Sequence, residues 1–182
     1  ESSDFLKIRL NMWMKHGRFS KKKVYLLSAG TYAAFDFNRM GAYKGKSYKW
    51  GYFPETENIE CIEKLCDEKE PGSILWVGRY LDWKHPEILV EIGKRLAEAK
   101  IPFHIKMIGP GNLFEKIKGK IESEKMNDYI EQTGAMSPER VREYMKKSEI
   151  LIFSSDFHEG WGAVLNEAMN SGCAVAASHA IG

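Results

Sequence analysis

The chain has 182 residues, of which 43% are hydrophobic and 29% charged, so it suits a single domain, or one domain with a remnant of another. Its 27 basic and 25 acidic side chains leave a net charge of +2, which gives no reason to expect nucleic acid as a partner. Three cysteines without a Cys-x-x-Cys pair argue against a disulfide framework or a structural zinc site and favour a reducing compartment, and the sequence has neither a bilayer-spanning apolar run nor a signal peptide.

The first 23 residues predict a basic helix. Apolar side chains such as Leu6 and Trp13 are interleaved with cations that end in the run Lys21, Lys22 and Lys23. Cations beside Trp and Leu suit a membrane surface that carries anionic headgroups. A helix whose apolar face packs on another domain would give the same pattern, and the irregular spacing of the apolar residues favours this second interpretation.

The next stretch has weaker patterns. An apolar run predicts a strand at 24–28, and a helix over 29–39 and a second short strand at 47–50 follow. Residues 55–72 are acidic and polar, and we interpret them as a connector and the entrance to a new domain.

From Ser73 onward, predicted strands and helices alternate. The strands are expected at 74–77, 104–108, 129–132, 149–153 and 174–177, and the helices at 86–99, 113–125, from 137 onward and at 162–170. Ser137 and Pro138 suit the N-cap and the first helical position of the third helix. This alternation indicates an α/β fold with right-handed crossovers on a parallel sheet. Ligands bind such sheets beyond the carboxyl ends of the strands, so the residues just after each strand are the informative ones.

Two cations, Arg79 and Lys84, follow the first strand of this region. A guanidinium can make a planar two-point contact with a phosphate, and an ammonium adds a mobile point charge, so the pair suits a diphosphate. Two solvated surface cations would give the same pattern. After the second strand, Gly109 and Gly111 leave the main chain uncovered, although any tight turn between a strand and a helix would explain them.

The strongest signal follows the fourth strand. Glu159 precedes Gly160 and Gly162, whose backbone N–H groups could approach an anion closely at the start of a helix, and Glu167 would lie about two turns along that helix. Eight residues of mostly helical rise amount to about 10 Å, which matches the span from sugar to ribose across a diphosphate. One carboxylate would then bind sugar hydroxyls and the other ribose hydroxyls. A loop glutamate beside an ordinary capped helix is the alternative.

The combined motif Gly-Arg-x4-Lys, then Glu-Gly-Trp-Gly-x4-Glu-Ala-Met-x2-Gly, resembles family 4 of the retaining glycosyltransferases over residues 74–182. A weaker match at Gly51-Tyr52-Phe53-Pro54 resembles the family's crossing between its two domains. The resemblance implies a GT-B fold, of which this chain would hold most of the carboxyl-terminal, Rossmann-like half. Residues 1–56 would then be a remnant of the first domain with the crossing, and residues 57–182 a nucleotide-sugar-binding domain that is incomplete at its end.

The resemblance also implies roles for individual residues. Arg79 and Lys84 would bind the diphosphate and stabilise its growing charge, Glu159 would orient the sugar, and Glu167 would bind the ribose. The predicted catalytic residues are Arg79, Lys84 and Glu159. The predicted substrate-binding residues are these three together with Gly109, Gly111, Gly160, Trp161, Gly162 and Glu167. Trp161 stands where the family often has Phe or Leu, which keeps an apolar wall.

The activity that the resemblance implies belongs to an intact, two-domain enzyme. Such an enzyme transfers a sugar with retention from a donor such as a UDP- or GDP-sugar to a glycan or lipid-linked hydroxyl acceptor, without a metal or other cofactor. By analogy with relatives, the expected setting is bacterial polysaccharide or glycolipid biosynthesis in the cytoplasm, with peripheral membrane contact through the absent domain. We expect no turnover by this fragment alone.

Two other functions remain open at this point. A nucleotide-sugar-binding module without catalysis would need the same residues. A nicotinamide-dependent oxidoreductase would also use a Rossmann sheet, but the third glycine of its Gly-x-Gly-x-x-Gly fingerprint is missing after Gly111. His158 either touches the donor or is a solvated loop residue, and we interpret His104, at the start of a strand, as structural.

Overall fold

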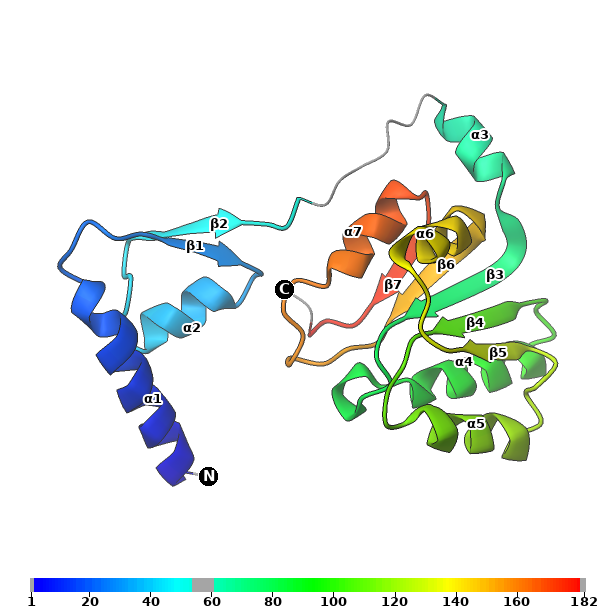
Figure 1. Cartoon of the computed structure of the whole chain (residues 1–182), viewed down its shortest axis with the longest axis horizontal. Coiled ribbons are helices and arrows are strands. Elements are labelled where there is room, and N and C mark those ends of the chain that lie inside the picture. Colours follow the sequence, from blue (N-terminus) through cyan, green and yellow to red (C-terminus); the bar gives the residue numbers. More distant parts are fainter. Residues whose placement is uncertain (1, 54–60, 181–182) are drawn as a thin grey trace. The chain divides into compact units, whose positions relative to one another are not determined.

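The computed structural model describes residues 2–53 and 61–180. These residues form two compact units, which we call the amino-terminal unit (residues 2–53) and the carboxyl-terminal unit (residues 61–180), and each is described by itself (Figure 1). The predicted boundary between residues 56 and 57 lies outside the described residues, and so does the predicted end of the second domain at residues 181–182.

The amino-terminal unit is a small α/β structure. It contains α1 (Ser2–His16), the 3-10 helix η1 (Gly17–Phe19), β1 (Leu26–Ala29), α2 (Ala33–Arg39) and β2 (Ser47–Trp50). β1 and β2 are parallel, with Leu27 opposite Tyr48. The helix predicted over the first 23 residues ends at His16, and Leu6 and Trp13 on it are 63% and 58% exposed. Both interpretations of this helix stay predictions.

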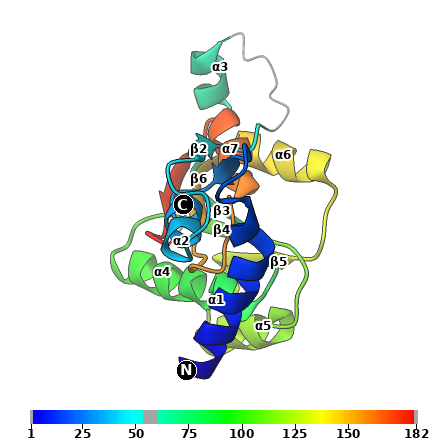
Figure 2. The ribbon, with the colours of Figure 1, turned by 90° about the vertical axis from the view of Figure 1, so that its left-hand side faces the viewer.

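The carboxyl-terminal unit alternates strands and helices as the sequence predicts. It contains α3 (Ile62–Asp67), β3 (Glu70–Val77), the 3-10 helix η2 (Asp82–Lys84), α4 (Glu87–Glu98), β4 (His104–Ile108), α5 (Phe114–Ser123), β5 (Ile130–Thr133), α6 (Pro138–Lys147), β6 (Ser148–Phe153), α7 (Ala163–Asn170) and β7 (Ala174–Ala177). The strands form one five-stranded parallel sheet in the order β5-β4-β3-β6-β7. α4 and α5 cover one face of this sheet, and α6 and α7 cover the other (Figures 1 and 2). The predicted fold class is confirmed.

Local sequence explains where one helix begins, and tertiary pairing explains where one strand begins. α6 begins as predicted, because the Ser137 side chain accepts a hydrogen bond from the Arg140 backbone N–H at 3.3 Å and Pro138 takes the first helical position. The strand expected from residue 74 begins earlier, at Glu70, so the stretch interpreted as a connector and the entrance to a new domain contains α3 and the first residues of β3. Those first strand residues are exposed, so they lack the apolar pattern of a buried strand, although Glu70 pairs with Ser148 of β6.

The strand order determines where the core lies and where the crossover connections diverge. β3 is the central strand, and Leu75 and Trp76 on it are 0% and 2% exposed. From β3 the chain runs outward to β4 and β5 and then returns to β6 on the other side of β3. The connections after β3 and β6 therefore leave on opposite faces of the sheet. In parallel sheets, a ligand crevice forms beyond the carboxyl ends of two such strands.

Candidate functional site

The loop after β3 carries Lys84 at the end of η2. The Lys84 side chain is only 13% exposed, and its ammonium lies 4.6 Å from the ring centroid of Trp83 and 5.0 Å from that of Phe153 at the end of β6. Aromatic faces attract a cation, more strongly when the cation is shielded from water. Lys84 is therefore a fixed, partly desolvated charge rather than a solvated surface cation.

The loop after β6 places Glu159 directly on Lys84. The two side chains form an ion pair through Oε2 of Glu159, whose side chain is 12% exposed. The Ser155 hydroxyl donates a second hydrogen bond to the same oxygen at 2.9 Å. The structure thus brings together two predicted site residues that lie 75 positions apart in the sequence, and we call them the Lys84–Glu159 pair.

Backbone contacts hold the two loops together around this pair. The Asp156 N–H donates to the Trp83 carbonyl at 2.9 Å. The Ser154 hydroxyl donates to the Lys84 carbonyl at 2.6 Å and accepts from the indole N–H of the buried Trp76 at 3.1 Å. The loops after β3 and β6 therefore behave as one connected structure in the described chain.

The predicted glycine turn after β4 packs against the loop after β3. A Cβ atom on Gly109, which has φ of 140°, would lie 1.9 Å from the Gly78 carbonyl oxygen. A Cβ on Gly111 would lie 2.4 Å from the carbonyl oxygen of Tyr80, whose own N–H donates to Pro110 at 2.8 Å. These glycines are required by close backbone packing, as the tight-turn alternative states, and their predicted contact with a ligand remains untested.

The glycines before α7 differ from each other. Gly162 is buried and left-handed (φ 70°, ψ 56°) at the N-cap, and a Cβ there would lie 3.0 Å from Phe153. Gly160 is exposed, and a Cβ there would meet open space. The Trp161 indole N–H donates to Oδ1 of Asn166 at 2.9 Å, which ties the turn to the first part of α7.

Arg79 and Glu167 are the two charged residues of the predicted site that are not members of the ion pair. Arg79 is exposed two residues after β3, and Glu167 is half-buried on α7. Because α7 begins at Ala163, Glu167 lies about one turn along the helix and not two, as the sequence interpretation had it. Among the described residues, neither side chain joins the Lys84–Glu159 pair. Whether all four residues share one ligand stays a prediction.

An acidic and histidine-rich cluster borders the pair and was missed as a group by the sequence analysis. Asp156 receives a hydrogen bond from the His158 backbone N–H at 2.9 Å and contacts the His158 ring at 2.8 Å and the His85 ring at 3.5 Å. The backbone hydrogen bond is the largest cause that lowers the pKa of Asp156. The His158 side chain is 77% exposed, so it lies at the solvent boundary of the site.

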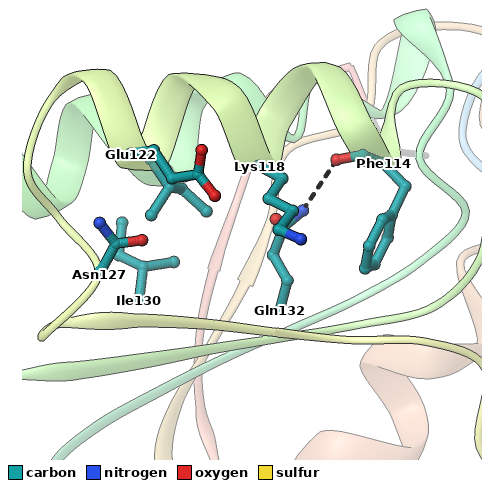
Figure 3. A pocket seen from close by; sticks show the side chains of 7 residues that line it. Phe114, Lys118, Glu122, Asn127, Ile130 and Gln132 are labelled. Carbon is teal, nitrogen blue, oxygen red and sulfur yellow. Dashed lines mark hydrogen bonds between the residues drawn. The ribbon is translucent and has the colours of Figure 1, made fainter.

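The structure also contains a pocket of about 270 Å³ between α5 and β5, and none of the predicted site residues lines it (Figure 3). Its lining consists of Phe114, Lys118, Ile121, Glu122, Asn127, Ile130 and Gln132. The Gln132 amide donates to the Phe114 carbonyl at 3.3 Å across the pocket (Figure 3). No sequence motif pointed to this pocket.

The described part of the chain offers neither a metal-binding group of side chains nor a membrane-spanning helix. In residues 2–53 and 61–180, no three His, Cys, Asp or Glu side chains are grouped closely enough to hold a metal ion. No helix in the same ranges has the length and apolar character needed to span a bilayer. His104, interpreted as structural, lies 3.6 Å from Glu131 of the neighbouring strand.

Several known proteins are similar to this chain in sequence or in fold. An uncharacterised glycosyltransferase, MJ1178 of Methanocaldococcus jannaschii, is 32% identical over 107 residues, which are 59% of this chain and 28% of that protein. The structure of Anabaena Alr3699/HepE with UDP and glucose is 16% identical with a TM-score of 0.70, and the match covers 96% of this chain and 49% of that one. A Staphylococcus aureus TarM mutant with UDP is 14% identical with a TM-score of 0.68, over 87% and 30% of the two chains.

This chain therefore spans less than half the length of these relatives. Its α/β unit, with a five-stranded parallel sheet between helices, matches the carboxyl-terminal domains of GT-B glycosyltransferases. The family described as glycosyl transferases group 1 matches residues 59–182, which is more than half of the sequence and includes the Lys84–Glu159 pair. The chain belongs to the glycosyl transferases group 1 family.

Proposed function

We propose that the carboxyl-terminal unit binds the nucleoside-diphosphate sugar donor of a retaining glycosyltransferase of family 4. The supporting observation is the Lys84–Glu159 pair, which lies beyond the carboxyl ends of β3 and β6, where the sheet connections diverge. A cation and a carboxylate in direct contact suit a ligand that carries phosphate oxygens beside sugar hydroxyls.

The two charges have different tasks in this proposal. An ammonium has three N–H donors, and Glu159 takes one of them, so two remain for the diphosphate. An ionised carboxylate has two oxygens, each of which accepts more than one hydrogen bond. Glu159 therefore keeps acceptor capacity for sugar hydroxyls while it stays paired with Lys84. The sugar and the first phosphate of a donor are adjacent, as Lys84 and Glu159 are.

The remaining predicted residues complete the donor site. Arg79, exposed after β3, reaches the diphosphate from solvent, and the N–H groups at the start of α7 add partial positive charge. Glu167 binds the ribose. Negative charge grows on the diphosphate as the glycosidic bond breaks, and fixed donors that face this charge lower the barrier without reorganisation. In this proposal no metal is needed, because these cations do that work.

The transfer itself belongs to a longer protein. Anabaena HepE has been crystallised with UDP-glucose, and a pneumococcal O-GlcNAc transferase with UDP and GlcNAc. These ligands support a nucleotide-sugar donor for this chain and make UDP the first nucleotide to test. A glycan or lipid-linked hydroxyl is the proposed acceptor, within polysaccharide or glycolipid biosynthesis on the cytoplasmic side of a membrane. The chain alone should not turn over.

Calorimetric titration of the chain with UDP, GDP and ADP, and with their glucose conjugates, tests the proposal. One nucleotide should bind at micromolar to millimolar strength. Lys84→Met and Glu167→Gln should each weaken it about three- to thirtyfold, because each removes a charge-assisted hydrogen bond. Lys118→Met is the matched control, since Lys118 is exposed on α5 beside the other pocket and should leave affinity unchanged. Binding that survives both site substitutions would refute the assignment.

A nucleotide-sugar-binding module without catalysis is the second candidate. The largely buried Lys84–Glu159 pair supports it as well, because binding needs the same groups. A sugar-transfer assay on a two-domain relative that carries this unit separates the two functions. An enzyme shows turnover, which falls when the residue equivalent to Lys84 is replaced, whereas a binding module shows none.

A further inference from the structure

Two adjacent serines at the end of β6 hold the two members of the Lys84–Glu159 pair. The Ser154 hydroxyl donates to the Lys84 carbonyl at 2.6 Å, and the Ser155 hydroxyl donates to Oε2 of Glu159 at 2.9 Å. We propose that Ser155 is a positioning residue for the donor sugar: it fixes the Glu159 carboxylate so that Oε2 faces the protein and Oε1 is left to accept sugar hydroxyls. This inference rests on the proposed function.

The hydrogen-bond pattern on Glu159 supports this division. Both donors that reach the carboxylate, the Ser155 hydroxyl and the Lys84 ammonium, use Oε2. No hydrogen bond from the residues that the structure describes ends on Oε1. Two donors on one oxygen define the plane of the carboxylate, whereas one donor would leave the last torsion of the side chain broadly distributed.

Ser155 is itself rigidly placed. Its residue is 1% exposed, and its carbonyl accepts a hydrogen bond from the Ser178 hydroxyl just after β7. The Ser178 backbone N–H donates to the Phe153 carbonyl at 3.0 Å, which continues the pairing of β6 with β7 by one step. The sheet therefore holds the Ser155 backbone from the β7 side while its hydroxyl points to Glu159.

A merely structural serine would behave differently. A buried hydroxyl that only satisfies its neighbours affects stability when it is removed, and it affects every ligand equally through that loss. A hydroxyl that orients Glu159 should affect only the part of the ligand that Glu159 touches. In the proposed site that part is the sugar, whereas the diphosphate contacts Lys84 and Arg79.

The test compares Ser155→Ala with wild type in calorimetric titrations with UDP and with UDP-glucose. The substitution should raise the Kd for UDP-glucose about three- to tenfold, as the loss of one typical intramolecular hydrogen bond predicts, and should change the Kd for UDP less than about twofold. Ser148→Ala is the matched control. It removes a buried hydroxyl from the opposite end of β6, where that hydroxyl donates to Tyr144 at 2.8 Å.

A double-mutant cycle shows whether Ser155 acts through Glu159. Once Glu159→Gln is present, adding Ser155→Ala should cause no further loss of UDP-glucose affinity. Equal weakening of both ligands by Ser155→Ala, or additive losses in the cycle, would overturn the inference while leaving the donor site in place. If wild type bound neither these ligands nor their GDP and ADP counterparts, the proposed function would fail and the inference would fall with it.

Discussion

The Lys84–Glu159 pair makes a sharp prediction about stability. Its side chains are 13% and 12% exposed, so Lys84→Met would leave the Glu159 carboxylate largely buried with one serine hydroxyl and no counter-charge. Breaking a fully buried pair costs about 3–5 kcal/mol, and the residual exposure here lowers the expected loss of unfolding free energy to about 2–3 kcal/mol. Glu159→Gln should cost less, about 1–2 kcal/mol, because the Trp83 and Phe153 rings still stabilise the Lys84 ammonium.

The double variant Lys84→Met/Glu159→Gln should be close to wild type, since it leaves no uncompensated charge. Urea unfolding followed by circular dichroism measures the unfolding free energies of wild type, the two single variants and the double variant. Hydrogen exchange of the β3 and β6 amides assigns the transition to the carboxyl-terminal unit. The control cycle uses Lys106 and Glu131, whose side chains are 17% and 48% exposed, and its coupling should stay below about 1 kcal/mol. If the coupling energy between Lys84 and Glu159 were as small as that of the control pair, it would show that water screens the ion pair, and the reasoning would be refuted.

Three further predictions follow from single contacts. Gly109→Ala should lower the unfolding free energy by more than about 3 kcal/mol because its Cβ would collide with backbone, whereas Gly160→Ala should lie within about 0.5 kcal/mol of wild type by urea unfolding. Maleimide labelling read by mass spectrometry should modify the two exposed cysteines of the native chain and reach Cys173 only in urea, because Cys173 is buried and burial raises the pKa of its thiol. The hydrogen bond from Lys106 lowers the pKa of Glu131 in the folded state. The ionised Glu131 therefore stabilises the fold above pH 4.5, and this stabilisation is lost as the pH falls through the lower native pKa. In Glu131→Gln, the free energy of unfolding should accordingly fall less steeply on the acid side.

The fold could be predicted because its signal is periodic and local. Each central strand is a short apolar run such as 74–77, and each crossover helix has its own start signal, as Ser137 and Pro138 show for α6. The prediction failed where tertiary pairing overrides composition. The first residues of β3 are exposed and polar at the sheet's end, and they form a strand because β6 lies beside them.

For the candidate site, the sequence predicted two residues that the structure brings into contact, but it did not predict the contact itself. The rule that ligands gather beyond the carboxyl ends of strands selected Lys84 and Glu159, because each follows a strand. The sequence interpretation assigned them to the diphosphate and to the sugar, and their direct contact was not foreseen. That contact depends on β6 lying next to β3, which no local pattern encodes. Ser155 was missed because a serine after a strand looks like any other turn residue.

The ion pair also bears on which residues would attract the donor in the proposed site. Lys84 and Glu159 together carry no net charge, so at long range they offer little attraction to a diphosphate. In the proposal, attraction would then come from groups outside the pair, namely the exposed Arg79 and the N–H groups at the start of α7. In the proposed site the pair acts at short range, where the Lys84 ammonium binds phosphate oxygens and the Glu159 carboxylate accepts sugar hydroxyls. In the proposed site, long-range attraction of the nucleotide and selectivity for the sugar would thus depend on different residues, with Arg79 and the start of α7 serving the first and Glu159 the second.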